Sequence, residues 1–518
     1  MKTLKSLVPV FLLFIAATVA VSCSDDETSS SSSVITTPNL EDIIASDSGH
    51  MTWHEYYSKI LAKAEEGNSA EATAMAEWAK TRLHEADSLT QALADSLGFN
   101  GDSYLDQLMV GFAWHKLNYK SIDENGKDIT LSTLVAYPWG TFWDPHPDNL
   151  IIGCHSNVTS KSACPTNFEV YNWLDDVYEM IVHAGTLGWQ ALVVLPDYQG
   201  FGVSETHVHP YLQLDLMARQ VVDAAIQAKT WYEANHKSMD EGWATLVEGS
   251  TTGASMAMAT QRYIEKHNLS GKLNFKGSIC AGGIYDPLAT VRSYISKGKV
   301  YTPSLLACII KGLCDCNSRL KGLYTPEDFL AEGFVGTGFL QDIEQKNASA
   351  DKLKSYKNPS GAFFMQEDKT GYYCTVSQVL RPEVIAYLKN GTLSDQYKDK
   401  LTRLQQALED NNLTCDWTPQ HPMIVFHSKK DEVVPYINYT NALQAFKESG
   451  MFKGQWYEDS NSWEELAQFR HEETCSEFFS HYEAYYIGSL LKNLDWINHG
   501  SIDIEAINSN APFKKPID

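Results

Sequence analysis

The feature that most constrains the fold of this chain is a five-residue segment at 249–253, Gly-Ser-Thr-Thr-Gly. The apolar run at 243–247 before it predicts a short buried strand, and the small residues at 254–263 after it favour a helix. Glycines flank a sharp turn from strand to helix because the turn leaves no room for β-carbons beside its central residue. The segment therefore predicts a strand, a strained turn that exposes a hydroxyl group as a candidate nucleophile, and a helix.

The position of that hydroxyl group has two alternatives. If the glycines at 249 and 253 are the two that the turn requires, the nucleophile is Thr251 and the next N–H group belongs to Thr252. If the nucleophile is Ser250, then Glu248 and Thr252 stand where glycines belong and would crowd the turn. A β-branched threonine has fewer side-chain rotamers than serine, which favours Ser250 on chemical grounds. The glycine requirement favours Thr251, and both alternatives stay open.

A carboxylate and a histidine follow in the order that would complete a catalytic triad with this hydroxyl group. The strand-like run at 422–427 leads into a loop that contains Asp431, and His471 lies just before an apolar helix expected at 478–491. Hydroxyl, carboxylate and histidine in this chain order match one of the known triad arrangements. The chain has 16 histidines and 65 acidic residues, so neither residue is evidence by itself. The prediction rests on all three residues occurring in this chain order.

Each of these two residues also has a purely structural interpretation. Asp431 could simply begin a turn before Pro435, since aspartate and proline both favour turns. His471 could be a surface residue at the start of the last helix, with His481 as a rival base ten residues later. His481 falls inside the expected helix rather than in the loop before it, so the sequence favours His471.

With these motifs in place, the chain resembles α/β-hydrolases of the esterase and secretory-lipase type, in the lipoprotein form found in Bacteroides-like bacteria. The resemblance extends from about Leu108 to Leu491. Three further segments carry it: Ile-Ile-Gly-Cys-His-Ser-Asn at 151–157, Leu-Pro-Asp-Tyr-Gln-Gly-Phe-Gly at 195–202 with His-Pro-Tyr at 209–211, and Cys-Ala-Gly-Gly-Ile-Tyr-Asp at 280–286. There are two departures from the family pattern. Its His-Gly pair is His-Ser here, and its nucleophilic serine is replaced or displaced.

The resemblance implies the α/β-hydrolase fold, with a mostly parallel central sheet, helices on both faces and a helical lid insertion. It also implies a carboxylic ester hydrolase that works through an acyl-enzyme. In that reaction Asp431 would orient His471, and His471 would take the proton of the attacking hydroxyl group of Thr251 or Ser250.

The same resemblance implies an oxyanion hole formed by backbone N–H groups near Asn157 and at Thr252. The expected substrate is a small-molecule ester, and the reaction needs no metal ion or organic cofactor. Because the turn departs from the family pattern, a second class of function is also open. The chain could be a non-catalytic binding protein that kept the fold and lost the nucleophile. The sequence leaves the oligomeric state undecided.

The start of the chain resembles a lipoprotein signal peptide. A short basic region at 1–5 precedes an apolar core at 7–17, which is too short to span a bilayer as a stable helix. The segment Ala-Val-Ser-Cys at 20–23 then indicates that Cys23 is lipidated and becomes the mature N-terminus. The acidic residues that follow are similar to the surface-export signals of such lipoproteins. We therefore expect a protein anchored through Cys23 at the bacterial outer membrane or cell surface; an ordinary cleaved signal peptide is the alternative.

The sequence pattern divides the chain into six segments. They are a signal peptide at 1–22, a flexible tether at 23–50, an N-terminal helical segment at 51–103, a first part of the hydrolase core at 104–284, a helical lid insertion at 285–418 and a second part of the core at 419–518.

Strand and helix patterns alternate through the core. A hairpin is expected at 108–119 and 129–137 around an Asn-Gly turn, followed by strands at 150–154, 191–195, 244–247, 277–280, 423–427 and 455–457. Strands that alternate with helices predict a parallel, covered sheet.

A long insertion separates two of these strands. About 140 residues lie between 280 and 423, which is far longer than an ordinary connection. The segments at 329–356 and 381–408 look helical. The apolar run at 303–310 could line an acyl pocket or form the insertion's own core, and the second interpretation is favoured because apolar runs usually mean packing.

Composition limits the partners. A net charge of −24 argues against nucleic acid and against an anionic membrane surface, so contact with a membrane is expected only through the N-terminal lipid. Nine cysteines remain besides Cys23, and some of them could pair in an oxidising compartment. The Cys-Asp-Cys segment at 314–316 lacks a second ligand pair at zinc-site spacing, so no metal site is predicted there.

Overall fold

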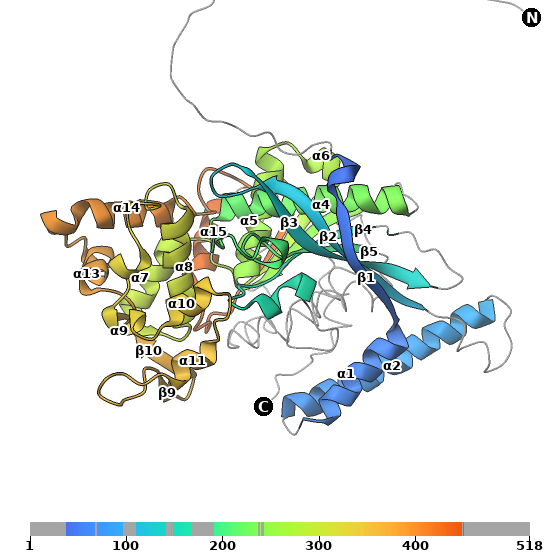
Figure 1. Cartoon of the computed structure of the whole chain (residues 1–518), viewed down its shortest axis with the longest axis horizontal. Helices are drawn as coiled ribbons and strands as arrows, with labels where there is room; N and C mark the ends of the chain where they lie inside the picture. Colours follow the sequence, from blue (N-terminus) through green and yellow to red (C-terminus); the bar gives the residue numbers. More distant parts are fainter. Residues whose placement is uncertain are drawn as a thin grey trace, which may run out of the picture. The chain divides into compact units, whose positions relative to one another are not determined.

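The computed structural model describes residues 38–67, 70–96, 110–140, 147, 149–167, 191–236, 239, 243–447 and 449. Within this part of the chain an eight-stranded sheet has the order β1-β2-β3-β5-β4-β6-β7-β11 (Figure 1). Its strands are β1 (Ile44–Thr52), β2 (Val110–Ile122), β3 (Asp128–Gly140), β4 (Asn149–Cys154), β5 (Ala191–Pro196), β6 (Ala244–Ser250), β7 (Phe275–Ala281) and β11 (Met423–Phe426).

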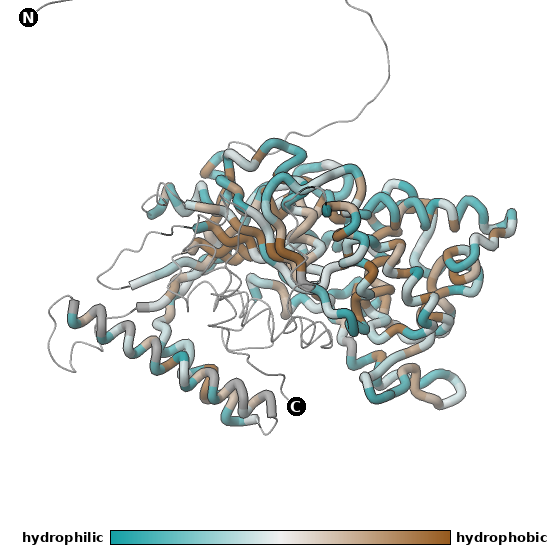
Figure 2. The backbone as a smooth tube through the Cα atoms, turned by 180° about the vertical axis from the view of Figure 1, so that it is seen from behind, coloured by the Kyte–Doolittle hydropathy of each residue, from teal (hydrophilic) through white to brown (hydrophobic). Residues whose placement is uncertain are grey.

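The sheet changes from antiparallel to parallel along its width. Strands β1, β2, β3 and β5 pair antiparallel, whereas β5, β4, β6, β7 and β11 pair parallel. Every residue of β4, β5 and β6 is buried, as expected for parallel strands that are covered on both faces. Figure 2 shows the most hydrophobic residues along these central strands. The core strands expected from the sequence are present, apart from the one at 455–457, which lies outside the described residues.

Helices follow the parallel strands. The long helix α4 (Leu214–Asn235) packs beside α5 (Thr252–Lys266), and α5 lies against β4, β6 and β7. The short helix α6 (Ser270–Leu273) leads into β7, and α15 (Ile437–Phe446) follows β11. The carboxyl ends of β4, β6, β7 and β11 therefore lie at one edge of the sheet, which is where ligands bind in open α/β sheets.

The N-terminal segment contains two helices, and a strand that the sequence pattern did not indicate precedes them. Residues of β1 were expected to belong to a flexible tether, and the structure instead pairs them antiparallel with β2. Helix α1 (Trp53–Glu65) begins at a capping box formed by Thr52 and Glu55 and is followed by α2 (Ala70–Ser96). The ring of Trp53 lies tilted against that of Phe112 in β2, with 5.0 Å between ring centroids, and this contact joins α1 to the sheet.

The segment between β7 and β11 folds into short helices and a three-stranded sheet of order β8-β10-β9. We call this segment, residues 282–422, the insertion; whether it acts as a lid stays a prediction. Its elements are α7 (Pro287–Lys297), β8 (Lys299–Val300), α8 (Pro303–Cys316), α9 (Glu332–Val335), α10 (Phe339–Glu344), α11 (Ala350–Ser355), β9 (Gln366–Asp368), β10 (Gly371–Thr375), α12 (Val376–Val379), α13 (Pro382–Asn390) and α14 (Lys398–Glu409).

The helices of the insertion are shorter than the sequence suggested. The segment 329–356 is broken into α9, α10 and α11, because Gly338 and Lys346 both have positive φ values, 74° and 53°. A left-handed residue cannot continue a right-handed helix. In α8, residues 305–310 of the apolar run at 303–310 are fully buried, which agrees with the packing interpretation. Among the described residues, no helix combines the length and the apolar character needed to cross a membrane.

Candidate active site

The turn predicted at 249–253 is present, and Thr251 is its central residue. Strand β6 ends at Ser250 and helix α5 begins at Thr252, so Thr251 stands between them with φ 54° and ψ −121°. Its N–H donates to the carbonyl of Ala281, at the end of the neighbouring strand β7, over 2.8 Å. A positive φ is rare for a β-branched residue and costs about 1–3 kcal/mol, so the surrounding structure must hold it in place.

Both glycines of the segment are sterically required. A β-carbon on Gly253 would lie 2.0 Å from the carbonyl oxygen of Cys154, and one on Gly249 would lie 2.2 Å from the carbonyl oxygen of Gly253. Ser250 instead belongs to β6, is buried, and is paired with Ala281. The backbone therefore has the glycine spacing that places Thr251, and not Ser250, at the turn.

We expect Gly253→Ala to destabilise the fold strongly. The added methyl group has only backbone beside it, at the end of β4, and backbone cannot rotate away. The expected loss in free energy of unfolding is about 3 kcal/mol or more, measured by urea denaturation. Gly271→Ala is the matched control, because a β-carbon there meets nothing within 4 Å. Equal stability of the two variants would contradict the close approach of α5 to β4.

The two residues expected to form the oxyanion hole line one small cavity. Thr252 is the first residue of α5, and Asn157 follows the end of β4. Together with Tyr198 and His209 they border a cavity of about 20 Å³, which has room for roughly one water molecule or one oxygen atom. The N-terminus of a helix carries free N–H groups and a partial positive charge, so α5 offers a favourable environment for a negative oxygen.

The departure His155-Ser156 also lies at this cavity. The ring of His155 stacks on Tyr198 with 4.1 Å between centroids, and its Nδ1 lies 2.7 Å from the carbonyl oxygen of Ser156. Tyr198 in turn donates a hydrogen bond from its hydroxyl group to the carbonyl of His155 over 3.3 Å. The loop after β4 is thus packed against the loop after β5.

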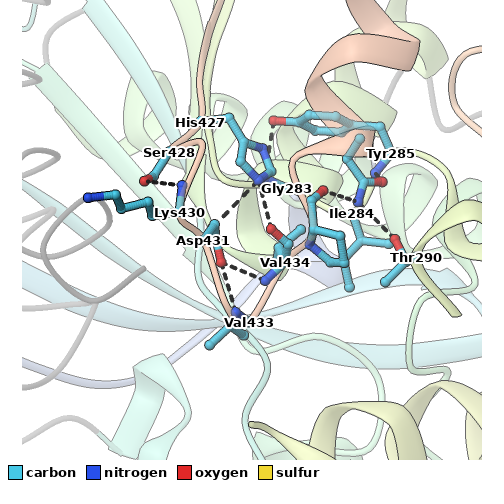
Figure 3. Close-up of polar contacts among 12 residues, drawn as sticks. Gly283, Ile284, Tyr285, Thr290, His427, Ser428, Lys430, Asp431, Val433 and Val434 are labelled. Atoms are coloured by element: carbon cyan, nitrogen blue, oxygen red, sulfur yellow. Dashed lines mark hydrogen bonds and ion pairs between the residues drawn. The ribbon is translucent and has the colours of Figure 1, made fainter. Parts of the chain in front are cut away.

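Asp431 lies in the loop that follows β11, and its carboxylate is buried. Its Oδ1 accepts hydrogen bonds from the N–H groups of Val433 and Val434, over 2.9 and 2.7 Å (Figure 3). Its Oδ2 lies 3.5 Å from Nε2 of His427. Asp431 therefore forms a turn before Pro435, as its structural interpretation expects. Two backbone donors also fix the orientation of the carboxylate, as an orienting acid requires.

The sequence analysis overlooked His427. This histidine is fully buried and its Nε2 lies 2.9 Å from the carbonyl oxygen of Val434, so the ring and the Asp431 carboxylate share one closed loop (Figure 3). The only sequence signal was its position four residues before Asp431 at the end of a strand.

Thr251 and Asp431 follow strands that are two places apart in the sheet, with β7 between them. Neighbouring strands are about 4.8 Å apart, so the two strand ends are about 10 Å apart, a gap that a histidine ring between them can bridge. His471, the predicted base, lies outside the described residues, as do His481, the expected C-terminal helix and Cys23. The structure thus places Thr251, Ser250, Thr252, Asn157 and Asp431, and the histidine stays a prediction.

Asp197, which follows the end of β5, is buried among hydrogen-bond donors. Burial raises the pKa of its carboxyl group to about 6, although hydrogen bonds from Ser132 and Thr166 oppose that rise. Both of these donors lie on other segments, so Asp197 ties β3 and the loop after β4 to the end of β5.

His209 should make stability depend on pH. Burial lowers its pKa to about 3, and the nearby His155 and Lys346 lower it further, whereas its hydrogen bond to Gln199 opposes the shift. The unfolded chain takes up this proton below about pH 6.5 and the folded chain does not. The contribution of neutral His209 to the free energy of unfolding is therefore fully present above pH 6.5. It is lost as the pH falls towards 3, by about 1.4 kcal/mol per pH unit.

His209→Asn isolates this effect, because asparagine does not titrate and keeps an N–H donor for the Gln199 carbonyl. Between pH 7 and pH 5 the free energy of unfolding of the variant, relative to the parent, should rise by about 2 kcal/mol. Urea denaturation of both proteins at the two pH values measures this. A difference that does not change with pH would show that His209 titrates normally.

The cysteines among the described residues are all free thiols, so the pairing that the sequence left open is not found there. Burial raises the pKa of Cys280 to about 12 and that of Cys308 to about 12. No group of three or more metal-binding side chains occurs within the described part of the chain.

Comparison with solved structures supports the fold. The ligand-bound rice cell wall degrading esterase LipA from Xanthomonas oryzae superposes with a TM-score of 0.55 at 18% identity, over 85% of this chain and 98% of that one. A second structure of LipA gives a TM-score of 0.53 at 19% identity, over 78% and 95%. A candidate hydrolase from Legionella pneumophila gives 0.55 at 16% identity, over 77% and 93%. The chain has the α/β-hydrolase fold. No family model and no curated protein sequence matches it.

Proposed function

We propose that the protein is an exported, lipid-anchored carboxylic ester hydrolase that forms an acyl-enzyme on Thr251. The observation that carries this proposal is the strained turn at Thr251. A β-branched residue is held there at φ 54° between two glycines that cannot be replaced without a clash. Strain of this kind persists where it serves a function, and here it presents a hydroxyl group beside the N-terminus of α5.

The proposed reaction has two steps. In the first, His471 takes the proton of Thr251 while Oγ1 attacks the ester carbonyl, and Asp431 keeps His471 in the reactive tautomer. The N–H groups near Asn157 and at Thr252 bind the oxygen that becomes negative; in well-studied cases each such donor contributes about 3 kcal/mol. The C–O bond to the alcohol breaks and His471 protonates the departing alkoxide. In the second step His471 takes a proton from a water molecule that attacks the acyl carbon. The bond from that carbon to Oγ1 of Thr251 then breaks, and His471 returns the proton to Oγ1.

Two observations support the substrate class and the location. LipA from Xanthomonas oryzae, which shares the fold, is named an esterase. The N-terminal segment of this chain, with Cys23 after an apolar core, resembles a lipoprotein signal. We therefore propose that the substrate is an ester encountered outside the cell.

A second function is favoured by one specific observation. Thr251 carries a methyl group on its β-carbon, which restricts its rotamers and crowds the attacking oxygen. A binding protein that has lost its reactivity would keep the fold and the small cavity but would not turn over esters.

Hydrolysis of p-nitrophenyl acetate, butyrate and octanoate by the full chain in detergent separates the two functions. The esterase proposal predicts saturable release of p-nitrophenol by the parent protein. It also predicts that Ser250→Ala stays within about threefold of the parent, because Ser250 belongs to β6. An inactive parent together with an active Thr251→Ser variant would instead identify a binding protein built on a disarmed hydrolase.

A further inference from the structure

Two loops line the small cavity, and both are held by the same short stretch of the insertion. One loop follows β4 and contains Asn157, and the other follows β5 and contains Tyr198 and His209. The stretch is residues 346–348, between α10 and α11. It lies about 190 residues further along the chain than the first loop, so its contacts with that loop are long-range contacts.

The loop after β4 pairs with this stretch as an isolated antiparallel bridge between Ser160 and Asn347. Three hydrogen bonds surround the bridge. The N–H of Lys161 donates to the carbonyl of Lys346 over 2.9 Å, and the N–H of Ala348 donates to the carbonyl of Thr159 over 3.1 Å. The hydroxyl group of Thr159 also donates to the carbonyl of Ala348 over 3.1 Å.

The side chain of Lys346 joins the second loop to the same stretch. Its Nζ donates to the carbonyl of His207 over 3.1 Å and to that of Glu344 over 3.4 Å. Lys346 is only 8% exposed and has a φ of 53°. A buried lysine in a strained backbone conformation is costly, so these carbonyl contacts are specific rather than incidental.

Helix α8 of the insertion adds a third contact. Its Gly312 lies so close to Tyr211 that a β-carbon would be 2.2 Å from the carbonyl oxygen of Tyr211. The hydroxyl group of Tyr211 donates to the carbonyl of Val158 over 3.4 Å.

We infer that the insertion positions the oxyanion hole, with Lys161 and Lys346 as positioning residues. The N–H of Lys161 ties the loop carrying Asn157 to residues 346–348, and the side chain of Lys346 ties the loop after β5 to the same stretch. This inference rests on the proposed function for its catalytic consequence. An oxyanion donor works only within a few tenths of an ångström of its productive position. A shift of residues 346–348 would therefore move the donor and lower the rate without disturbing substrate binding elsewhere.

Lys161→Pro tests the bridge at a site that tolerates proline. Lys161 is exposed, it is the first residue of the 3-10 helix η3 (Lys161–Ala163), and Ser160 before it is extended, with φ −120° and ψ 138°. Proline fits both conditions, and it removes the N–H that donates to Lys346 together with the exposed lysine side chain. Lys161→Ala is the matched control, because it removes the side chain and keeps that N–H. Lys346→Met tests the second contact by removing the Nζ donor and keeping an apolar stem.

Two readouts are taken on the full chain. Hydrogen exchange is followed by mass spectrometry. In Lys161→Pro, exchange of peptides covering 155–160 should accelerate about threefold to tenfold, and in Lys346→Met the same acceleration is expected for peptides covering 203–209, whereas Lys161→Ala should leave both unchanged. With p-nitrophenyl butyrate, kcat should fall by a similar factor while KM stays within about twofold.

The outcomes separate this inference from the proposed function. Unchanged exchange in both variants would overturn the inference, and so would faster exchange with an unchanged kcat. If the parent protein hydrolyses no ester, the proposed function fails, whereas the exchange measurement still decides whether the insertion holds the loop.

Discussion

Replacing Thr251 by alanine is expected to abolish ester hydrolysis, with kcat falling by about 10⁴-fold or more. The hydroxyl group that would form the acyl-enzyme is lost, and in a triad the loss of the nucleophile costs nearly as much as the loss of all three members. The fold should survive, because the N–H of residue 251 still donates to Ala281. Initial rates with p-nitrophenyl butyrate measure the effect, and urea denaturation checks the fold.

Thr251→Ser is the matched variant. It keeps the hydroxyl group and removes the methyl group that limits the rotamers of the attacking oxygen. We expect kcat to be equal to that of the parent or higher, by up to about tenfold. If Thr251→Ala kept the parent rate while Ser250→Ala lost it, the assignment of the nucleophile would be reversed.

Asp431→Asn should lower kcat by about 10⁴-fold, because an amide cannot hold the histidine in the tautomer that accepts the proton. The amide oxygen can still accept the hydrogen bonds from Val433 and Val434 that Asp431 now accepts. The loop should therefore keep its shape, and KM should change little. Steady-state kinetics at pH 7 and 8 provide the measurement.

Asp286→Asn is the control for this variant. Asp286 also lies in a loop after a parallel strand, but its Oδ1 accepts from the N–H of Ala289 at the start of α7, a capping role that asparagine retains. The activity of Asp286→Asn should stay within a few-fold of the parent.

His471→Ala should lose as much activity as Asp431→Asn or more, and combining the two substitutions should lower the activity little further. Parent-like activity of Asp431→Asn would remove Asp431 from the site.

The central part of the fold could be predicted from the sequence because its signals are local. Strands β4, β5 and β6 each contain an apolar run and are buried throughout. The glycines at 249 and 253 mark the turn, because a β-carbon at either position would lie 2.0–2.2 Å from a backbone oxygen. The same local patterns predicted that Thr251 and Asp431 each follow a parallel strand.

Other features depend on contacts that no local pattern encodes. Strand β1 has a polar, mostly exposed pattern, and only its pairing with β2 makes it a strand. The long helix suggested at 329–356 is interrupted where Gly338 and Lys346 turn the backbone to positive φ. The bridge between Ser160 and Asn347 joins residues whose proximity comes from the tertiary fold.

Covalent labelling can identify the nucleophilic residue itself. The full chain would be treated with a fluorophosphonate, which reacts with the activated hydroxyl group of a serine-type hydrolase, and the modified peptide would be located by mass spectrometry. If Thr251 is the nucleophile, we expect one phosphonate on Thr251. The labelling should disappear in Thr251→Ala and in His471→Ala and should remain in Ser250→Ala. A phosphonate on Ser250, or no labelling of a folded parent protein, would contradict this assignment.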